Sequence, residues 1–114
     1  MRNDGTTQMI VVCVWLAKDG TGLVKMRKWE ETGWWMEWDD EGLTYDKLIS
    51  RTSEVIKEQA YKNVGTFIKL SITSENEDSS ICEDTFCENL KLVLSPKTSK
   101  LRVSSNGRLI IFHP

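Results

Sequence analysis

The 114-residue chain contains only two prolines, one histidine and three cysteines. An odd number of cysteines in so short a chain argues against a disulfide framework. We therefore interpret Cys13, Cys82 and Cys87 as reduced thiols, which predicts a cytoplasmic or nuclear protein. With few prolines and only seven glycines, the composition also excludes a collagen-like or low-complexity chain.

Long hydrophobic runs are lacking as well. The apolar run from Met9 to Leu16 is far shorter than the about 20 residues that a bilayer span needs. No small-residue cleavage site of the kind that ends a signal peptide follows it. The sequence therefore predicts no contact with a membrane.

The sequence also lacks an excess of positive charge. Fifteen Lys and Arg against 17 Asp and Glu give a net charge of −2, which argues against a nucleic-acid partner. The chain is 39% hydrophobic and 28% charged, as expected for a globular protein. Its length suits a single domain. We expect a flexible N-terminus over residues 1–8 and one domain over 9–114.

Sequence motifs of enzymes are also missing. The chain has no Gly-x-Ser-x-Gly, no phosphate-binding loop and no Gly-x-Gly-x-x-Gly. Its one histidine, His113, lies next to the last residue, where a catalytic dyad with a cysteine would be poorly positioned. The candidate zinc ligands are His113, Cys13, Cys82 and Cys87. Cys13 lies in an apolar run, where thiols usually behave as small hydrophobes, which argues against a zinc site. We predict no enzyme activity, cofactor or metal.

The first part of the chain has the pattern of a β-hairpin. Residues 9–17 are apolar and β-branched, typical of a central strand covered on both faces. Residues 18–22 contain Asp-Gly and predict a turn. Residues 23–29 alternate, with Val24 and Met26 on one face and Lys25 and Arg27 on the other. Residues 34–38 fit either a third strand or an ordered loop.

A helix is predicted next. Apolar and small residues recur at spacings of three and four from residue 45 to residue 60. Thr44 is the expected N-cap, and residues 63–65 should end the helix. The stripe consists of Tyr45, Leu48, Ile49, Thr52, Val55, Ile56 and Ala60.

The last part of the chain predicts a strand, a helix and two strands. Residues 66–73 alternate as a strand, and Asp84 is a candidate cap for a helix ended by Pro96. We expect its apolar side to consist of Phe86, Leu90, Val93 and Leu94. Residues 100–103 and 108–112 form strands joined by an Asn106-Gly107 turn.

This order of elements predicts an α+β protein with a ubiquitin-like β-grasp. The expected architecture is a mixed sheet of four to six strands with one long helix and one short helix. The long helix would connect the second strand to the third and lie across one face of the sheet. Another α+β sheet of similar size is also compatible with the pattern.

Several of these segments together resemble a known family. Val11 to Trp15, a tryptophan-rich hairpin ending at Gly42, and the run from Leu43 to Ile49 are similar to the N-terminal ubiquitin-like domain of plant Mutator-like transposases and their domesticated relatives. The family's Ser/Thr-Tyr-x-x-Leu segment is matched by Thr44, Tyr45 and Leu48. The resemblance covers roughly residues 9–104 and implies a ubiquitin-like fold. The chain departs from the family in lacking a zinc knuckle and an acidic-triad transposase core.

Tryptophan is the unusual residue of this sequence. Four of the five lie within ten positions: Trp29, Trp34, Trp35 and Trp38. Adjacent residues of a strand point to opposite faces, so Trp34 and Trp35 cannot both enter one core. One interpretation places Trp35 against the helix, with Trp34 and Trp38 at a sheet edge. Another makes the outward rings a contact surface for a protein, since Trp is enriched in interface hot spots. Stacking on nucleic-acid bases or sugar rings is the third, which the surrounding acidic residues disfavour.

Charged residues flank these tryptophans. Lys25, Arg27 and Lys28 form a basic strip that is typical of a solvated strand face or of a contact with an acidic protein. Acidic segments at Asp39 and Asp40 and at residues 74–80 offer a complementary surface on a second copy, and strand edges at residues 108–112 could also pair. We predict a protein-interaction module that binds another protein or itself, and the alternative is a DNA-associated accessory domain of transposon origin.

Overall fold

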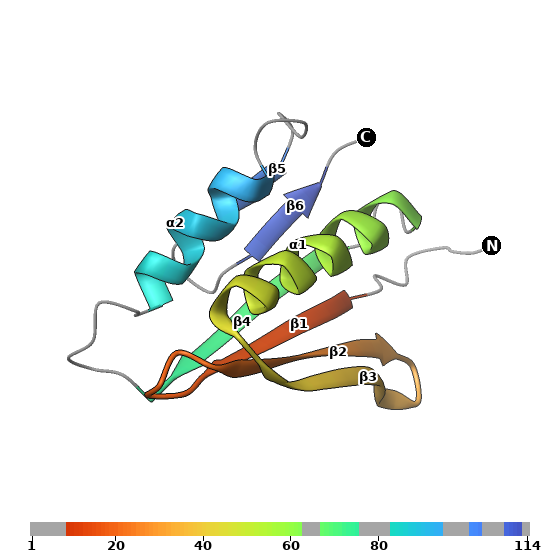
Figure 1. Ribbon diagram of the computed structural model, residues 1–114. Coiled ribbons are helices and arrows are strands. Elements are labelled where there is room, and N and C mark those ends of the chain that lie inside the picture. Colours follow the sequence, from red (N-terminus) through yellow and green to blue (C-terminus); the bar gives the residue numbers. More distant parts are fainter. Residues whose placement is uncertain (1–8, 63–66, 76–82, 95–100, 104–108, 113–114) are drawn as a thin grey trace.

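The strand β1 (Met9–Leu16) runs through the middle of a six-stranded mixed sheet. The computed structural model describes residues 9–62, 67–75, 83–94, 101–103 and 109–112. Along the chain, the other elements are β2 (Gly22–Glu30), β3 (Gly33–Leu43), α1 (Tyr45–Lys62), β4 (Phe67–Ser74), α2 (Glu83–Leu94), β5 (Leu101–Val103) and β6 (Leu109–Phe112). Figure 1 shows this arrangement.

The strand order in the sheet is β3-β2-β1-β4-β6-β5. The meander β1-β2-β3 is antiparallel, and β4 lies parallel to β1 on its other side. A parallel neighbour needs a crossover connection, and α1 is the element that crosses between β3 and β4. This confirms the predicted mixed α+β sheet with one longer and one shorter helix.

The segment 33–43 is a full strand, which resolves the choice between strand and loop. It lies at one edge of the sheet, beside β2. The long helix therefore connects the third strand to the fourth, and the expectation that it follows the second strand directly was wrong.

The turn between β1 and β2 has the predicted Asp-Gly chemistry. Gly20 has a φ of 90°, a conformation that side chains with a Cβ rarely adopt. The Oδ1 of Asp19 accepts hydrogen bonds from the hydroxyl and the backbone N–H of Thr21, at 2.6 and 3.0 Å. These bonds, the hydroxyl first, hold the pKa of Asp19 below its ordinary value.

Helix α1 has the predicted start and buried face. Its first intrahelical bond runs from the N–H of Leu48 to the carbonyl of Thr44, as expected for an N-cap. The predicted stripe is buried except for Tyr45, which packs partly buried against the core. The hydroxyl of Thr52 donates to the carbonyl of Leu48 at 2.7 Å, so this buried polar group is satisfied. The helix extends to Lys62, and the predicted stop at residues 63–65 lies outside the described residues.

Helix α2 differs from its prediction in two details. It begins at Glu83, so Asp84 lies within the first turn, where its charge still favours the helix dipole. Cys87 is buried and Val93 is 42% exposed, so the expected core position of Val93 was wrong. The buried face is Phe86, Cys87, Leu90 and Leu94, which follows the i, i+4, i+8 spacing of a helix stripe from Phe86 onward.

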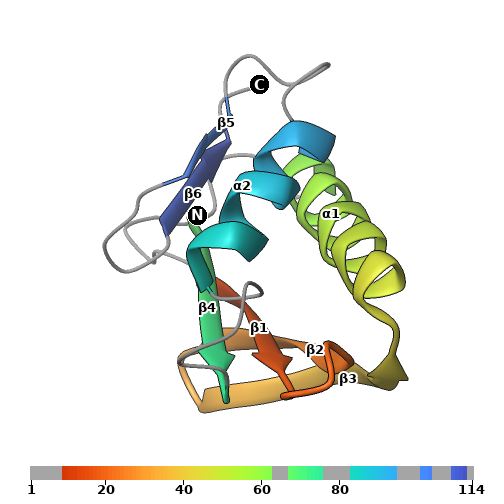
Figure 2. The ribbon, with the colours of Figure 1, turned by 60° about the vertical axis from the view of Figure 1, so that its left-hand side comes forward.

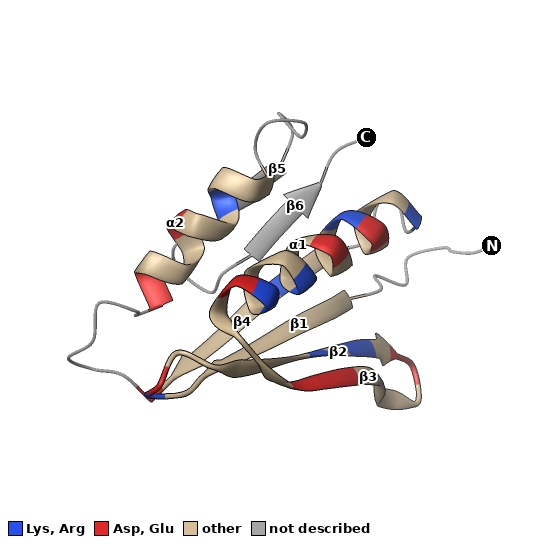
Figure 3. Ribbon diagram, in the orientation of Figure 1, with Lys and Arg blue, Asp and Glu red and all other residues tan. Residues whose placement is uncertain are grey.

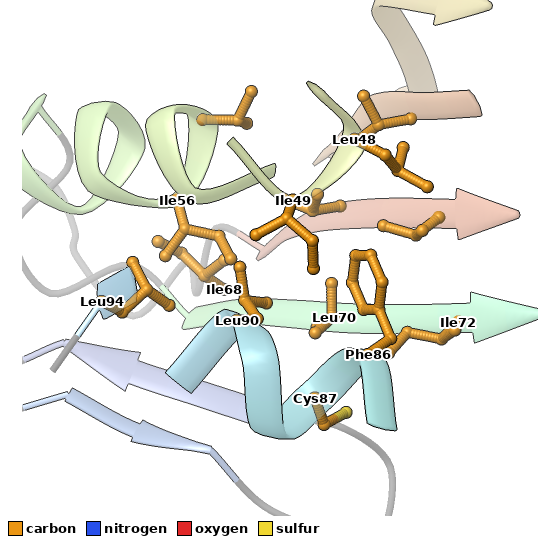
Figure 4. Packing of buried hydrophobic residues seen from close by; sticks show 14 of the residues in the cluster. Leu48, Ile49, Ile56, Ile68, Leu70, Ile72, Phe86, Cys87, Leu90 and Leu94 are labelled. Atoms are coloured by element: carbon orange, nitrogen blue, oxygen red, sulfur yellow. The ribbon is translucent and has the colours of Figure 1, made fainter. Parts of the chain in front are cut away.

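The core lies between the sheet and the two helices, which cover the same face (Figure 2). Every second residue of β1 points into it, because strand side chains alternate. Figure 4 shows the helix residues meeting those of β4. The fully buried strand residues are Ile10, Val12, Val14, Leu16, Val24, Ile68 and Leu70.

Strands β5 and β6 extend the sheet beyond β4. They confirm the two predicted strands near the C-terminus. The predicted Asn106-Gly107 turn, the helix stop at Pro96 and the N-terminal residues 1–8 lie outside the described part of the chain. Strand β6 lies between β4 and β5. Its edges are therefore both paired, and the suggested self-association through an exposed edge at residues 108–112 was wrong.

Candidate functional site

The sheet face that points away from α1 and α2 is here called the open face. It consists of alternate residues of β1 to β4, and residues paired in register lie side by side on it. From β1 and β2 it receives Val11, Cys13, Trp15, Leu23, Lys25, Arg27 and Trp29. From β3 and β4 it receives Trp34, Met36, Asp39, Lys69, Ser71 and Thr73. Within the described ranges, no helix covers this face.

One end of the open face carries an aromatic cluster. Trp29 and Trp34 are directly paired between β2 and β3, and their ring centroids are 5.2 Å apart in an edge-to-face arrangement. The guanidinium carbon of Arg27 lies 4.8 Å from the centre of the Trp34 ring, a cation–π contact. Trp29 and Trp34 are 40% and 43% exposed, and the neighbouring Met36 is 54% exposed. The structure thus brings together three residues that sequence reasoning had selected and adds Met36.

The other two hairpin tryptophans lie on the opposite face of the sheet. Trp38 is paired with Met26 and packs partly buried against the core. Trp35 is paired with Lys28 and is 53% exposed. The interpretation that put Trp35 inside and Trp38 at the edge was therefore wrong, although Trp34 and Trp35 do point to opposite faces as predicted.

A β-bulge explains why Trp38 lies on the core side of the sheet. Met26 is paired with Trp38, and the next residue of β2, Arg27, is paired with Met36. The register therefore shifts by one position here, and Glu37 is the extra residue of β3. An extra residue reverses the side to which every later residue of the strand points. Without the bulge, Trp38 would share a face with Trp34.

Arg51 of α1 attaches the part of β3 around Trp38 and Asp40 to the helix. Its guanidinium carbon lies 4.5 Å from the centre of the Trp38 ring, and its Nε donates to Oδ2 of Asp40 at 2.7 Å. Glu54, one turn further along α1, lies 3.6 Å from its Nη1. Asp40 thus forms an ion pair within the chain, on the side of the helices, whereas Asp39 lies opposite Lys25 on the open face.

Replacing Arg51 tests this attachment. We expect Arg51→Leu to lower the free energy of unfolding by about 1–2 kcal/mol, because a cation–π contact and a half-exposed ion pair are lost together. The control is Lys62→Leu, which removes only the exposed 3.0 Å pair with Glu58 on the same helix and should change stability by less than about 0.5 kcal/mol. Urea unfolding of both variants measures the difference, and equal losses would contradict the assignment.

The basic strip is divided between the two faces. Lys25 and Arg27 lie on the open face, and Lys28 points to the side of the helices, so the expected three-residue surface was wrong. Lys69 of β4 joins them, since Arg27 and Lys69 both pair with Val11 and form one row across the sheet. Lys25, Arg27 and Lys69 make no ion pair with any side chain that the structure describes. Figure 3 shows the basic stretch of β2 and the acidic stretch of β3.

A shallow depression occupies the other end of the open face. It has a volume of about 330 Å³ and is lined by Trp15 and Leu23, with Cys13, Lys25, Ser71 and Thr73 around them. Sequence reasoning did not select Trp15 or Leu23. The alternation that placed Lys25 and Arg27 on one face also places Leu23 there, and that signal could have identified it.

The described residues offer little catalytic chemistry. Among them, no group of three or more His, Cys, Asp or Glu side chains could hold a metal ion. Cys13 lies on the open face and Cys87 on α2 in the core, so these two do not converge. Cys82 and His113 lie outside the described residues. No described helix is both long and apolar enough to cross a bilayer.

Comparison of this chain with family models, with curated proteins and with solved structures found no match.

Proposed function

We propose that the chain is a non-enzymatic protein–protein interaction module that binds its partner through the open face, with the aromatic cluster of hairpin β2–β3 as the main contact. The observation that carries this proposal is the contiguous exposure of Trp29, Trp34 and Met36 beside Arg27. Trp and Arg dominate the energetics of protein interfaces, and Met is enriched in them. Large apolar side chains gathered at one place are typical of a surface that a partner covers.

The contacts of the rings favour a protein partner. A nucleic-acid base stacks on a free aromatic face. Trp34 already has Arg27 over its ring and Trp29 against it, at 4.8 and 5.2 Å. Part of the Trp34 ring is therefore already in contact with neighbouring side chains. The net charge of −2 points in the same direction.

A DNA-associated accessory domain is the second candidate. This candidate is favoured by three cations on one sheet face that make no ion pair with any described side chain, namely Lys25, Arg27 and Lys69. Binding of this kind should be seen in a gel shift at low salt and should weaken steeply as salt rises. Absence of a shift at micromolar protein would remove this candidate.

We also propose that the domain is of the transposase-derived, ubiquitin-like type. What supports this is the segment Thr44, Tyr45 and Leu48 at the start of a long helix that lies across a mixed sheet. The strand β3 between β2 and α1 departs from the predicted β-grasp order, in which the long helix follows the second strand.

The test compares two double variants as bait for affinity capture. Arg27→Glu with Trp34→Ala alters the aromatic cluster, whereas Lys47→Glu with Leu92→Ala makes matched changes at exposed positions of α1 and α2. Captured proteins are then purified and their dissociation constants measured by calorimetry. We expect binding to the first variant to be about thirtyfold weaker and binding to the second to be unchanged.

Self-association is examined with the same variants. Sedimentation velocity over a range of protein concentrations shows whether a second copy is the partner, and only the first variant should then stay monomeric. Circular dichroism confirms that both variants are folded. A partner that binds both variants equally would overturn the proposal.

A further inference from the structure

We infer that the partner contributes an extended, acidic segment with an apolar side chain at each end, lying along β2 on the open face. This inference rests on the proposed function and specifies the ligand of the same face. It follows from the order of residues along β2 and from the depression at one end of that strand. It also follows from the cations between the two ends, which make no ion pair with any described side chain.

The residues of β2 on the open face form an ordered series. Leu23, Lys25, Arg27 and Trp29 alternate with residues that point to the core side. The distance along the strand from Leu23 to Trp29 is six residue steps, or roughly 20 Å at ~3.3 Å per residue. An extended segment of the same length places every second side chain on this face, so its alternate positions meet the four β2 residues in turn.

Both ends of the series can receive apolar groups. At the Leu23 end, the depression lined by Trp15 and Leu23 is large enough, at about 330 Å³, for a single apolar side chain. At the other end, the exposed rings of Trp29 and Trp34 lie next to the exposed Met36. Covering these two places removes apolar surface from water, which is the main favourable term in association.

The middle of the series selects for negative charge. Arg27 and Lys69 flank Val11 in one row, and Lys25 lies in the next row beside Cys13. Asp39 lies opposite Lys25 on β3. Three cations that make no ion pair with any described side chain favour a segment with two acidic residues between its apolar ends.

The test uses three synthetic peptides and one oligonucleotide. The first peptide alternates in the order apolar, acidic, acidic, apolar at every second position. The second has the same composition in shuffled order, the third carries Lys in place of the acidic residues, and oligothymidylate represents single-stranded DNA. The protein carries Cys82→Ser, so that Cys13 at the rim of the depression is the reactive thiol, since Cys87 is only 5% exposed.

Two measurements follow binding at the two ends. Tryptophan fluorescence gives the dissociation constant, and the rate of alkylation by iodoacetamide shows whether the depression is covered. We expect the first peptide alone to protect Cys13, and we expect Arg27→Glu or Lys69→Glu to weaken its binding by about tenfold each, because an attractive contact becomes repulsive. Lys47→Glu on α1 is the control and should have no effect.

Other outcomes would overturn this inference. These are equal binding of the shuffled peptide, protection by oligothymidylate, or protection that rises with protein concentration in the absence of peptide, which would identify a second copy as the occupant. If no peptide binds but a protein is captured in a manner that depends on Trp34, the extended segment is wrong and the proposed function stands. Failure of both experiments removes both.

Discussion

Truncation of Phe86 to alanine should lower the free energy of unfolding by about 3–5 kcal/mol, a large fraction of the stability of a small domain. The Phe86 side chain is fully buried on α2. Its ring meets that of Tyr45 edge to face, with centroids 6.1 Å apart, and it lies beside Leu70 and Ile72 of β4 (Figure 4). The loss combines the transfer free energy of the ring with the cavity that remains.

This single side chain joins three elements, which explains the expected size of the effect. Tyr45 begins α1, and its hydroxyl accepts a hydrogen bond from Asn89 of α2 at 2.8 Å. Removing the Phe86 ring therefore weakens the attachment of α2 to α1 as well as to the sheet. Urea unfolding followed by circular dichroism measures the change.

The matched control lies on the same helix. Leu92 is 71% exposed, so Leu92→Ala should alter stability by less than about 0.5 kcal/mol. Comparable losses in the two variants would show that α2 does not pack as described. Phe86→Leu, which keeps most of the apolar volume, should recover part of the loss.

The second large effect is expected for Gly22→Ala, which should destabilise the fold by about 2–3 kcal/mol. A Cβ at Gly22 would lie 2.6 Å from Cδ2 of Leu48 and still closer to the carbonyl oxygen of Trp15. The leucine can move to some extent, but the Trp15 carbonyl belongs to the backbone of a central strand. Either the strand pair or the α1 contact must therefore shift.

A double-mutant cycle with Leu48→Ala tests the steric origin of this loss. Leu48→Ala alone should cost about 2–5 kcal/mol, since the side chain is fully buried. Because the smaller side chain relieves one of the two clashes, the double variant should lose less than the sum of the single losses by at least about 0.5 kcal/mol. Strict additivity, or a negligible effect of Gly22→Ala, would contradict the close approach. Thermal and urea denaturation give all four free energies.

Gly22 also matters for the open face. It pairs with Leu16 at the end of the β1–β2 hairpin, next to Trp15 and Leu23, which line the depression. A shift of the Trp15 backbone would change the shape of that depression. Stability and the candidate binding surface thus depend on the same local approach of backbone to helix.

Local patterns in the sequence were sufficient for most elements but left residues 34–38 open between a strand and a loop. The period of two in residues 23–29 correctly separated Val24 and Met26 from Lys25 and Arg27. The helical period identified the buried face of α1, and Thr44 marked its start. Such predictions succeed because hydrogen bonding and side-chain direction within an element depend on neighbours a few residues away.

The sequence by itself therefore determined the strands other than β3, the two helices and the shared face of Lys25 and Arg27. Only the tertiary structure decided that Trp38 packs inside and Trp35 outside, that Cys87 is buried in place of Val93, and that Trp15 and Leu23 line a depression beside Lys25. The physical reason is that a one-residue bulge reverses the facing of all later strand residues. Which face is then buried depends on where helices from distant parts of the chain come to lie.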